Sequence, residues 1–159
     1  MLIDTFELYF AYNQFMIFDT SVKLPGNDWT DEHIRQGFAR RPSSINFSTL
    51  IDFGTANVIV YKGSYILDNS DERVIAVPFL CVSGKVRIEG PEEISPRIVK
   101  IEQGNYKLTV AQTVNRATEI IKVYFNKLDT PLERSEIIVS DEELSTVTQI
   151  VETAEIMEL

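Results

Sequence analysis

The sequence is poor in the residues that build most redox, zinc and nucleophilic sites. Its 159 residues include one histidine, His33, and one cysteine, Cys81. A lone cysteine cannot close an internal disulfide, so a disulfide-stapled secreted scaffold is excluded. One histidine and one cysteine also cannot supply the ligands of a zinc site built mainly from these residues. A metal site with oxygen ligands stays open, because Asp and Glu together number 24.

Phosphate-binding motifs and long apolar runs are also absent. Neither common glycine-rich phosphate loop occurs in the chain. No apolar run approaches the roughly 18 residues that suggest a transmembrane helix. The first twenty residues are apolar but carry Asp4 and Glu7 where a signal peptide has basic residues, so we expect them to belong to the fold. Cytoplasmic residence is the default expectation, with membrane association through a partner left open.

The charge of the chain is negative and unevenly distributed. There are 15 basic and 24 acidic residues, which gives a net charge of −9. Residues 128–159 carry nine acids and one base, a net of −8, so the rest of the chain is nearly neutral. This balance disfavours direct nucleic-acid binding, which needs clustered Lys and Arg. A sharply acidic end is typical of a solvating tail or of a surface that attracts a basic partner.

Alternation of apolar and polar residues predicts strands over most of the chain. The segments are 6–12, 44–50, 56–62, 73–82, 85–89, 97–102, 106–114 and 119–126. A bulge or bend near Asn13 would explain a slip in phase, and Pro78 requires a sheet edge or a bulge. We interpret Ser83-Gly84 and residues 103–105 as hairpin turns. About eight strands with frequent turns favour a mainly β fold, a mostly antiparallel β-sandwich.

One short α-helix is predicted near residues 30–40. Thr30 can cap its first turn, where the helix dipole favours the acids Asp31 and Glu32. Pro42 prevents continuation of the helix.

Within this helix, Ile34 and Phe38 lie four residues apart and would form the apolar stripe. His33 would be exposed in the first turn, without the orienting partner that acid–base catalysis needs.

The last part of the chain is less regular. Residues 136–140 favour one more short strand, and Ser140–Glu143 resembles a capped helix start, so a larger C-terminal helix is the alternative. We assign residues 1–127 to a β-sandwich domain and residues 128–159 to an acidic C-terminal extension of the same domain. Because the strand pattern ends before Asp141, we expect removal of the residues from Asp141 onward to leave a folded protein.

No residue pattern points to an active site. Cys81 lies in an apolar run and is expected to be a small buried side chain. Adjacent acids such as Asp71-Glu72 point apart and are expected to be solvated. Residues 68–72 come nearest to a calcium loop but lack the glycine and distal glutamate of an EF-hand. No catalytic residue, metal or cofactor is therefore assigned.

The only tryptophan, Trp29, stands among acids. It either packs the helix onto the sheet or anchors a protein interface. Acids around such an anchor suit a basic partner. The candidate partner-binding residues are therefore this cluster and the acids of the extension: Asp28, Trp29, Asp31, Glu32, Asp141, Glu142 and Glu143.

Several of these residues also fit the pattern of a known family. The segments are 8–18, Asp28-Trp29-Thr30-Asp31-Glu32 with Ile34 and Gly37, Val77-Pro78-Phe79, and 104–109. In this order they resemble the competence protein J family, over roughly Leu8 to Gln112. The resemblance implies a small non-enzymatic inhibitor of the DNA-entry nuclease of bacterial competence, with relatives that are similar to immunity proteins. Beyond about Gln112 the chain departs from the pattern.

Three functions follow as hypotheses. In the first, the protein binds a cognate bacterial nuclease with a basic surface and blocks its DNA-binding cleft, in competence or in toxin immunity. In the second, it is a ligand-binding β-sandwich, for example a carbohydrate-binding module with Tyr61, Tyr65 and Tyr106 as candidate aromatics. In the third, it is a metal-dependent enzyme that uses only carboxylates.

Overall fold

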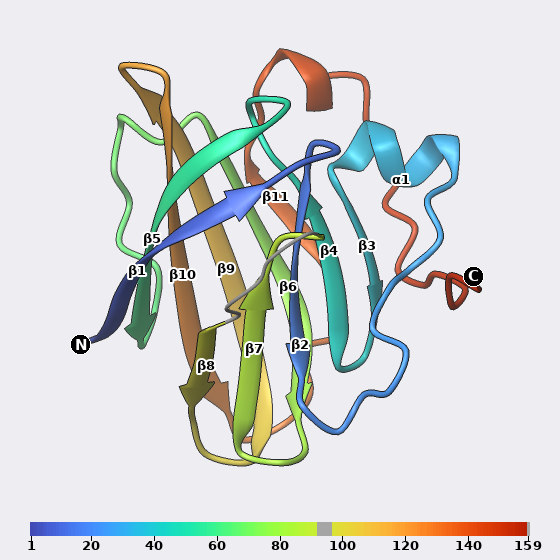
Figure 1. The fold of residues 1–159 in the computed structure, drawn as a ribbon. Coiled ribbons are helices and arrows are strands. Elements are labelled where there is room, and N and C mark those ends of the chain that lie inside the picture. The colour runs from blue at the N-terminus through green and yellow to red at the C-terminus, as the bar shows by residue number, and fades with distance from the viewer. Residues whose placement is uncertain (92–96, 159) are drawn as a thin grey trace.

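Two β-sheets pack face to face in the computed structural model, which describes residues 1–91 and 97–158 (Figure 1). In order across the first sheet, the strands are β1 (Leu2–Phe10), β5 (Gly54–Lys62), β10 (Thr118–Leu128), β9 (Gly104–Asn115), β6 (Arg73–Cys81) and β11 (Glu136–Val139). Those of the second sheet are β3 (Phe38–Arg41), β4 (Ser44–Ser48), β2 (Gln14–Asp19), β7 (Lys85–Glu89) and β8 (Arg97–Lys100). Neighbouring strands are antiparallel except β5 and β10. The predicted antiparallel sandwich is confirmed, with more strands than expected.

The core between the sheets follows the alternation in the sequence. Ala56, Val58 and Val60 of β5 point inward and are fully buried. From the second sheet, the rings of Phe15 and Phe47 stack with their centroids 5.5 Å apart. Burial of each large apolar side chain contributes about 1.5–3 kcal/mol, so this layer holds the two sheets together.

Both predicted hairpins are wrong, because each turn joins strands of different sheets. Ser83-Gly84 leads from β6 in the first sheet to β7 in the second, and residues 103–105 lie where the chain passes from β8 of the second sheet into the start of β9 of the first. The carboxylate of Asp19 accepts hydrogen bonds from the backbone N–H groups of Val82 (2.9 Å) and Ser83 (3.0 Å). These bonds stabilise the first crossing. The turn residues indicate where the chain reverses, but the sheet that receives the next strand depends on packing.

The phase slip near Asn13 also marks a passage from one sheet to the other. Tyr12 and Asn13 both have a φ of 58°, a left-handed conformation that costs a non-glycine residue about 1 kcal/mol. The predicted bend is therefore confirmed. Pro78 lies on β6 beyond the segment that pairs with β11, which spans Val74 to Ala76. This side of β6 is an edge at Pro78, as predicted.

The helix is shorter than predicted. α1 spans Asp31–Gln36 and ends at Gly37, which has a φ of 83°. The chain then enters β3, so Phe38 is buried in the sheet while Ile34 is 61% exposed. The predicted apolar stripe is wrong, because the left-handed glycine ends the helix before Phe38 is reached. Among the described residues no helix has both the length and the apolar character to cross a bilayer.

His33 is buried, which contradicts the expected exposed position. Its Nδ1 accepts a hydrogen bond from the backbone N–H of Thr30 (3.0 Å), and its Nε2 donates to the carbonyl of Thr153 (2.9 Å). The hydroxyl of Thr30 in turn accepts from the backbone N–H of His33, so the predicted cap is confirmed. The histidine therefore joins the helix start to the C-terminal extension.

The C-terminal extension wraps around the sandwich. β11 pairs with the edge of β6, and a single 3₁₀ turn, η1 (Glu142–Leu144), follows where the larger helix was the alternative. Leu144 of η1 is buried in the core. The chain then runs beside α1, where the N–H of Asp28 donates to the carbonyl of Glu155 (2.9 Å). This packing argues against the expectation that the protein folds without the residues from Asp141 onward.

Candidate partner-binding site

A hollow of about 280 Å³ opens at one end of the sandwich. It is lined by the β1–β2 connection, the helix region, the end of β4 and η1, through Tyr12, Asn13, Gln14, Trp29, Ile34, Ser48 and Glu143. The indole Nε1 of Trp29 donates to Oε1 of Gln14 (3.3 Å), and Nδ2 of Asn46 donates to the same oxygen (2.9 Å). These bonds orient the half-buried indole. Trp29 thus packs against the sheet and also lines an open surface.

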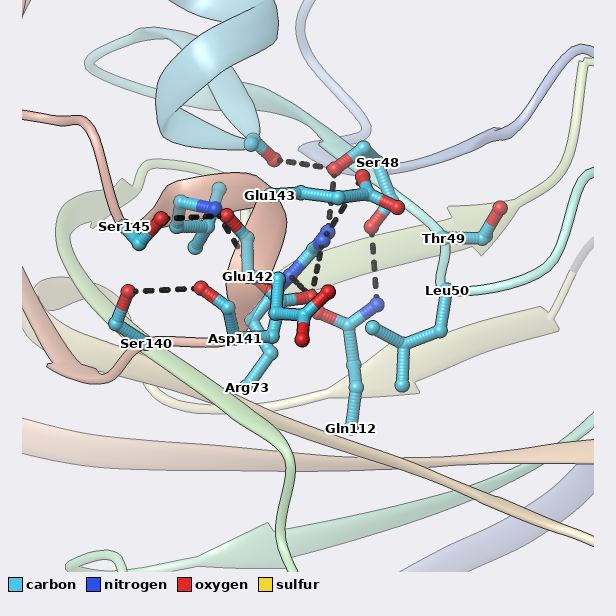
Figure 2. A network of polar contacts seen from close by, with 12 residues as sticks. Ser48, Thr49, Leu50, Arg73, Gln112, Ser140, Asp141, Glu142, Glu143 and Ser145 are labelled. Carbon is cyan, nitrogen blue, oxygen red and sulfur yellow. Dashed lines mark hydrogen bonds and ion pairs between the residues drawn. The ribbon is translucent and has the colours of Figure 1, made fainter.

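A fully buried arginine, Arg73, contacts two residues that line this hollow, Ser48 and Glu143 (Figure 2). The Nε and Nη2 groups of Arg73 donate to Oδ2 of Asp141 (3.1 and 2.6 Å), and Nη1 donates to the hydroxyl of Ser48 (2.7 Å). Nη2 also reaches Oε2 of Glu143 at 3.3 Å. A buried charge needs such partners, and breaking a buried pair costs about 3–5 kcal/mol. Arg73 therefore fixes η1, and with it Glu143, against the sandwich.

A buried carboxylate continues this network. Oε1 of Glu119 accepts from the backbone N–H groups of Leu50 (2.7 Å) and Ile51 (3.1 Å), and Oε2 accepts from Nε2 of Gln112 (2.9 Å). Burial raises the pKa of Glu119 above its usual range, although these three donors and Arg73 oppose the shift. The carboxylate holds the β4–β5 connection in place beside the hollow.

Sequence reasoning did not find Arg73, Gln112 or Glu119, although a signal was present. Each occupies an inward-facing position, in phase with the buried apolar residues of its strand. The three positions lie at the same end of β6, β9 and β10, where Arg73 is opposite Gln112. Polar residues in the inward phase of neighbouring strands indicate a buried polar network at that end of the sandwich.

Exposed acids lie on the chain segments that border the hollow. They come from the helix region, the β4–β5 connection and η1, and we call this surface the acidic end: Asp28, Asp31, Glu32, Asp52, Glu142 and Glu143. The carbonyl of Asp52 accepts from the N–H of Asn13 (2.9 Å), which places Asp52 beside the hollow. Arg35 pairs with Glu32 at 3.2 Å, but an exposed pair of this kind contributes little. Arg116, in the β9–β10 turn, is a further exposed base at this end.

The opposite end of the sandwich is rich in lysine. Figure 1 shows the connections from β6 to β7 and from β8 to β9 there. The lysines at these strand ends, which we call the lysine end, are Lys62, Lys85, Lys100, Lys107 and Lys127. Glu102 accepts a hydrogen bond from Lys127 (2.9 Å) and neutralises part of this charge. Lysines therefore gather at this end, where the exposed acids Asp129 and Glu133 also lie.

The structure brings the two sequence-distant groups of candidate residues to the same end. Trp29 and Glu143 line one hollow although 113 positions lie between them in the sequence. Asp28, Asp31, Glu32 and Glu142 are exposed around it. Asp141 differs from the others, because its carboxylate binds Arg73 and also accepts from the N–H of Leu144 (3.2 Å). Its contacts are those of a residue that holds η1 in place.

The remaining titratable candidates are engaged in the fold. Cys81 is buried, and burial raises the pKa of its thiol to about 11, so the thiolate that nucleophilic attack needs is not formed near neutral pH. Asp68 and Asp71 both contact Nζ of Lys122, at 3.4 and 2.9 Å. Within residues 1–91 and 97–158 the structure shows no group of three or more His, Cys, Asp or Glu side chains placed to hold a metal ion.

The aromatics proposed for sugar binding do not form an open platform. Tyr106 is buried, with 1% of its surface exposed. Tyr61 stacks on Tyr124 with 4.7 Å between ring centroids, and Tyr65 meets the same ring edge-on at 5.4 Å. Because Tyr61 and Tyr124 stack on each other and Tyr65 packs against Tyr124, the structure favours packing of the outer sheet surface over carbohydrate binding.

Comparison with known proteins identifies the family. A family model described as Competence protein J (ComJ) matches residues 7–131. The chain belongs to this family. A DNA-entry nuclease inhibitor of Bacillus subtilis (strain 168) is 32% identical over 105 residues, which cover 65% of this chain and 76% of that relative. The match reaches residue 131, so the family part extends beyond Gln112, where the departure was expected, and includes β9 and β10.

Two solved structures share the fold. One is the crystal structure of ComJ, inhibitor of the DNA degrading activity of NucA, from Bacillus subtilis, with a TM-score of 0.72 and 23% identity. It is matched over 80% of this chain and 98% of its own length. The other is described as Crocagin biosynthetic gene J, with a TM-score of 0.53 and 15% identity over 76% of this chain and 96% of its own. β11, η1 and the chain after them lie beyond the family match.

Proposed function

We propose that this protein is a non-enzymatic inhibitor that binds a nuclease through the acidic end of its sandwich. Membership of the ComJ family and the relative named DNA-entry nuclease inhibitor support the nuclease as the target. The observation that carries the choice of surface is the hollow beside Trp29 with acids around it. Tryptophan and tyrosine are enriched among the residues that anchor protein interfaces.

The mechanism follows from charge complementarity. A nuclease that holds DNA needs a basic cleft, because it must neutralise phosphates. The acidic end attracts such a cleft over a distance and, once bound, excludes the DNA. A standard interface covers about 800 Å² on each partner, so Trp29 and Tyr12 form its centre and the acids form its rim. The basic cleft would repel the lysine end, which therefore faces away from the nuclease.

The family suggests two biological settings for the complex. One is bacterial competence, in which the target is a DNA-entry nuclease. The other is immunity, in which the target is a toxic nuclease. We further propose cytoplasmic residence, with membrane association only through the bound nuclease. Capture of the target from the native host by the full chain separates the two settings, because the nuclease recovered is of one kind or the other.

A DNA degradation assay tests the proposal. The protein is titrated into the host nuclease and into NucA of Bacillus subtilis, the target named for the structural relative. We expect inhibition that saturates at a fixed ratio of the two proteins. Trp29→Ala should weaken inhibition by a factor of about 30 or more, because an interface anchor contributes about 2 kcal/mol or more.

Lys85→Ala at the lysine end is the matched control and should inhibit like the parent. Urea unfolding of both variants shows whether each remains folded. A folded Trp29→Ala variant with full inhibition would exclude the hollow from the interface. The absence of inhibition against both nucleases would contradict the proposed function itself.

A further inference from the structure

We infer that the hollow receives one arginine side chain of the partner, with Glu143 as its counter-ion. This inference rests on the proposed function for the identity of the partner, but its chemistry follows from the hollow alone. At about 280 Å³ the hollow lies at the lower limit of small-molecule sites, which span about 300–1,000 Å³. It fits a single side chain inserted from another protein surface.

The charge of Glu143 is available to such a ligand. Asp141 accepts two hydrogen bonds from Arg73, at 3.1 and 2.6 Å, and neutralises it. Glu143 has one longer contact with Arg73, at 3.3 Å through Oε2, and 67% of its side chain is exposed. Its Oε1 makes no hydrogen bond to a described residue. One carboxylate oxygen at the rim of the hollow can therefore accept from an incoming cation.

The other walls favour arginine as that cation. Trp29 and Tyr12 present aromatic surface, and Tyr12 is 73% exposed. A guanidinium is planar, weakly hydrated and stacks on aromatic rings, whereas an ammonium is a compact, strongly hydrated charge. Ile34, which is 61% exposed, offers aliphatic contact for the stem of the side chain. An arginine can therefore pair with the carboxylate, stack on the aromatic rings and pack its stem against the aliphatic side chain at the same time.

The two halves of this hollow have different origins in the chain. Trp29 and Tyr12 lie inside the family match, which ends at residue 131, and Glu143 lies beyond it. The aromatic half therefore belongs to the family part, and the counter-ion belongs to the C-terminal extension. Glu143 is for this reason a specificity-determining residue, which favours partners with an arginine at this place.

A titration with Nα-acetyl-arginine amide tests this inference without any nuclease. The indole N–H signal of Trp29 in a nitrogen–proton NMR spectrum reports binding, because Trp29 is the only tryptophan. We expect a saturable shift with the arginine derivative and none with the neutral citrulline derivative of the same shape. Glu143→Gln should weaken binding about tenfold, as expected for loss of a charge-assisted hydrogen bond.

Glu142→Gln is the matched control, because it removes the same charge from the neighbouring residue, which does not line the hollow. It should change binding by less than about twofold, since it removes only an exposed neighbouring charge. Equal shifts with arginine and citrulline derivatives, or equal effects of the two variants, would overturn the inference. The arginine–citrulline comparison on the parent protein decides the matter even where a variant is unstable. A failed titration beside successful nuclease inhibition would reject the arginine site and leave the proposed function standing.

Discussion

The family part of the chain and the C-terminal extension are held in place by different forces. The two facing sheets of the family part bury a continuous layer of Phe, Ile, Leu and Val side chains. Among the described residues of the extension, Leu144 is buried in the core, and Ile137, Val147 and Ile150 pack against it while partly buried. The extension also pairs β11 with β6 and forms hydrogen bonds to buried polar side chains of the family part. These polar anchors are His33, Gln36, Arg40 and Arg73.

Gln36 illustrates this mode of docking. Its Oε1 accepts from the N–H of Val151 (2.8 Å) and its Nε2 donates to the carbonyl of Val151 (2.9 Å). Arg40 donates to the carbonyl of Glu152 in the same stretch (3.0 Å). A buried polar group that loses its partner costs about 1–3 kcal/mol. The family part of this protein is therefore completed by its extension, because these buried polar groups find their partners there.

Removal of residues 141–159 should have the largest effect. It leaves Arg73 buried without Asp141, at about 3–5 kcal/mol, and removes Leu144 from the core, at about 2–5 kcal/mol. Because a domain is stable by only about 5–15 kcal/mol, we expect loss of most of the stability. Urea unfolding followed by circular dichroism measures it. Removal of residues 158–159 is the control. An equal urea midpoint for both truncations would show that the contacts of the extension do not stabilise the family part.

Asp141→Asn should destabilise the protein by about 2–3 kcal/mol, because it removes a charged acceptor from buried Arg73. Glu143→Gln, which removes the other acid from the same guanidinium, should cost less than about 1 kcal/mol because the Glu143 side chain is 67% exposed and its contact with Arg73 is longer. Thermal or urea unfolding of the two variants measures the difference. Equal losses would mean that Arg73 depends on both acids alike.

Asp19→Asn probes the corresponding polar contact within the family part. Burial alone would raise the pKa of Asp19, but hydrogen bonds from Ser21, Ser83 and Val82 outweigh it and lower the pKa below its ordinary value. Because the pKa is lower in the folded protein, the carboxylate stabilises the fold fully at pH values above its pKa in the unfolded chain. This contribution is lost as the pH falls through the pKa of the folded state.

We expect Asp19→Asn to cost about 1.5–3 kcal/mol at neutral pH, as for hydrogen bonds to a charged group. The parent protein should then lose more of its unfolding free energy than the variant between about pH 5 and pH 2. Urea unfolding across this range measures both curves. Parallel curves would show that Asp19 does not carry this dependence.

Glu142→Gln should have the smallest effect and should act on binding alone. An exposed rim charge changes mainly the association rate and its salt dependence, so we expect association about twofold slower at low salt. Stopped-flow fluorescence of Trp29 with the nuclease measures the rate, and Lys85→Gln at the lysine end is the control. A faster dissociation with unchanged association would place Glu142 in direct contact.

The sequence predicted the sandwich well because inward-facing alternation is a local property. It also predicted the Thr30 cap and the bend near Asn13. It did not predict which sheet each strand joins. Ser83-Gly84 looks like a hairpin turn, and the contact that stabilises the crossing there comes from Asp19, far away in the chain. The helix end was missed because the left-handed φ of Gly37 has no unique sequence signal.

The candidate site could be predicted only in part. Trp29 and its acids stand together in the sequence, so they were found directly. Their proximity to Glu143 depends on Arg73, a charged residue inside a strand that reads as apolar. Long-range pairing of this kind is absent from local periodicity. The acidic extension was recognised by its charge, whereas its docking by buried polar contacts was not.

Hydrogen exchange of the complex with the nuclease locates the binding surface on this protein. We predict slowed exchange on binding at residues 12–14, 29–34 and 142–144, which border the hollow, and unchanged exchange around Lys85 and Lys100. Protection confined to the lysine end, with the acidic end exchanging as in the free protein, would contradict the account.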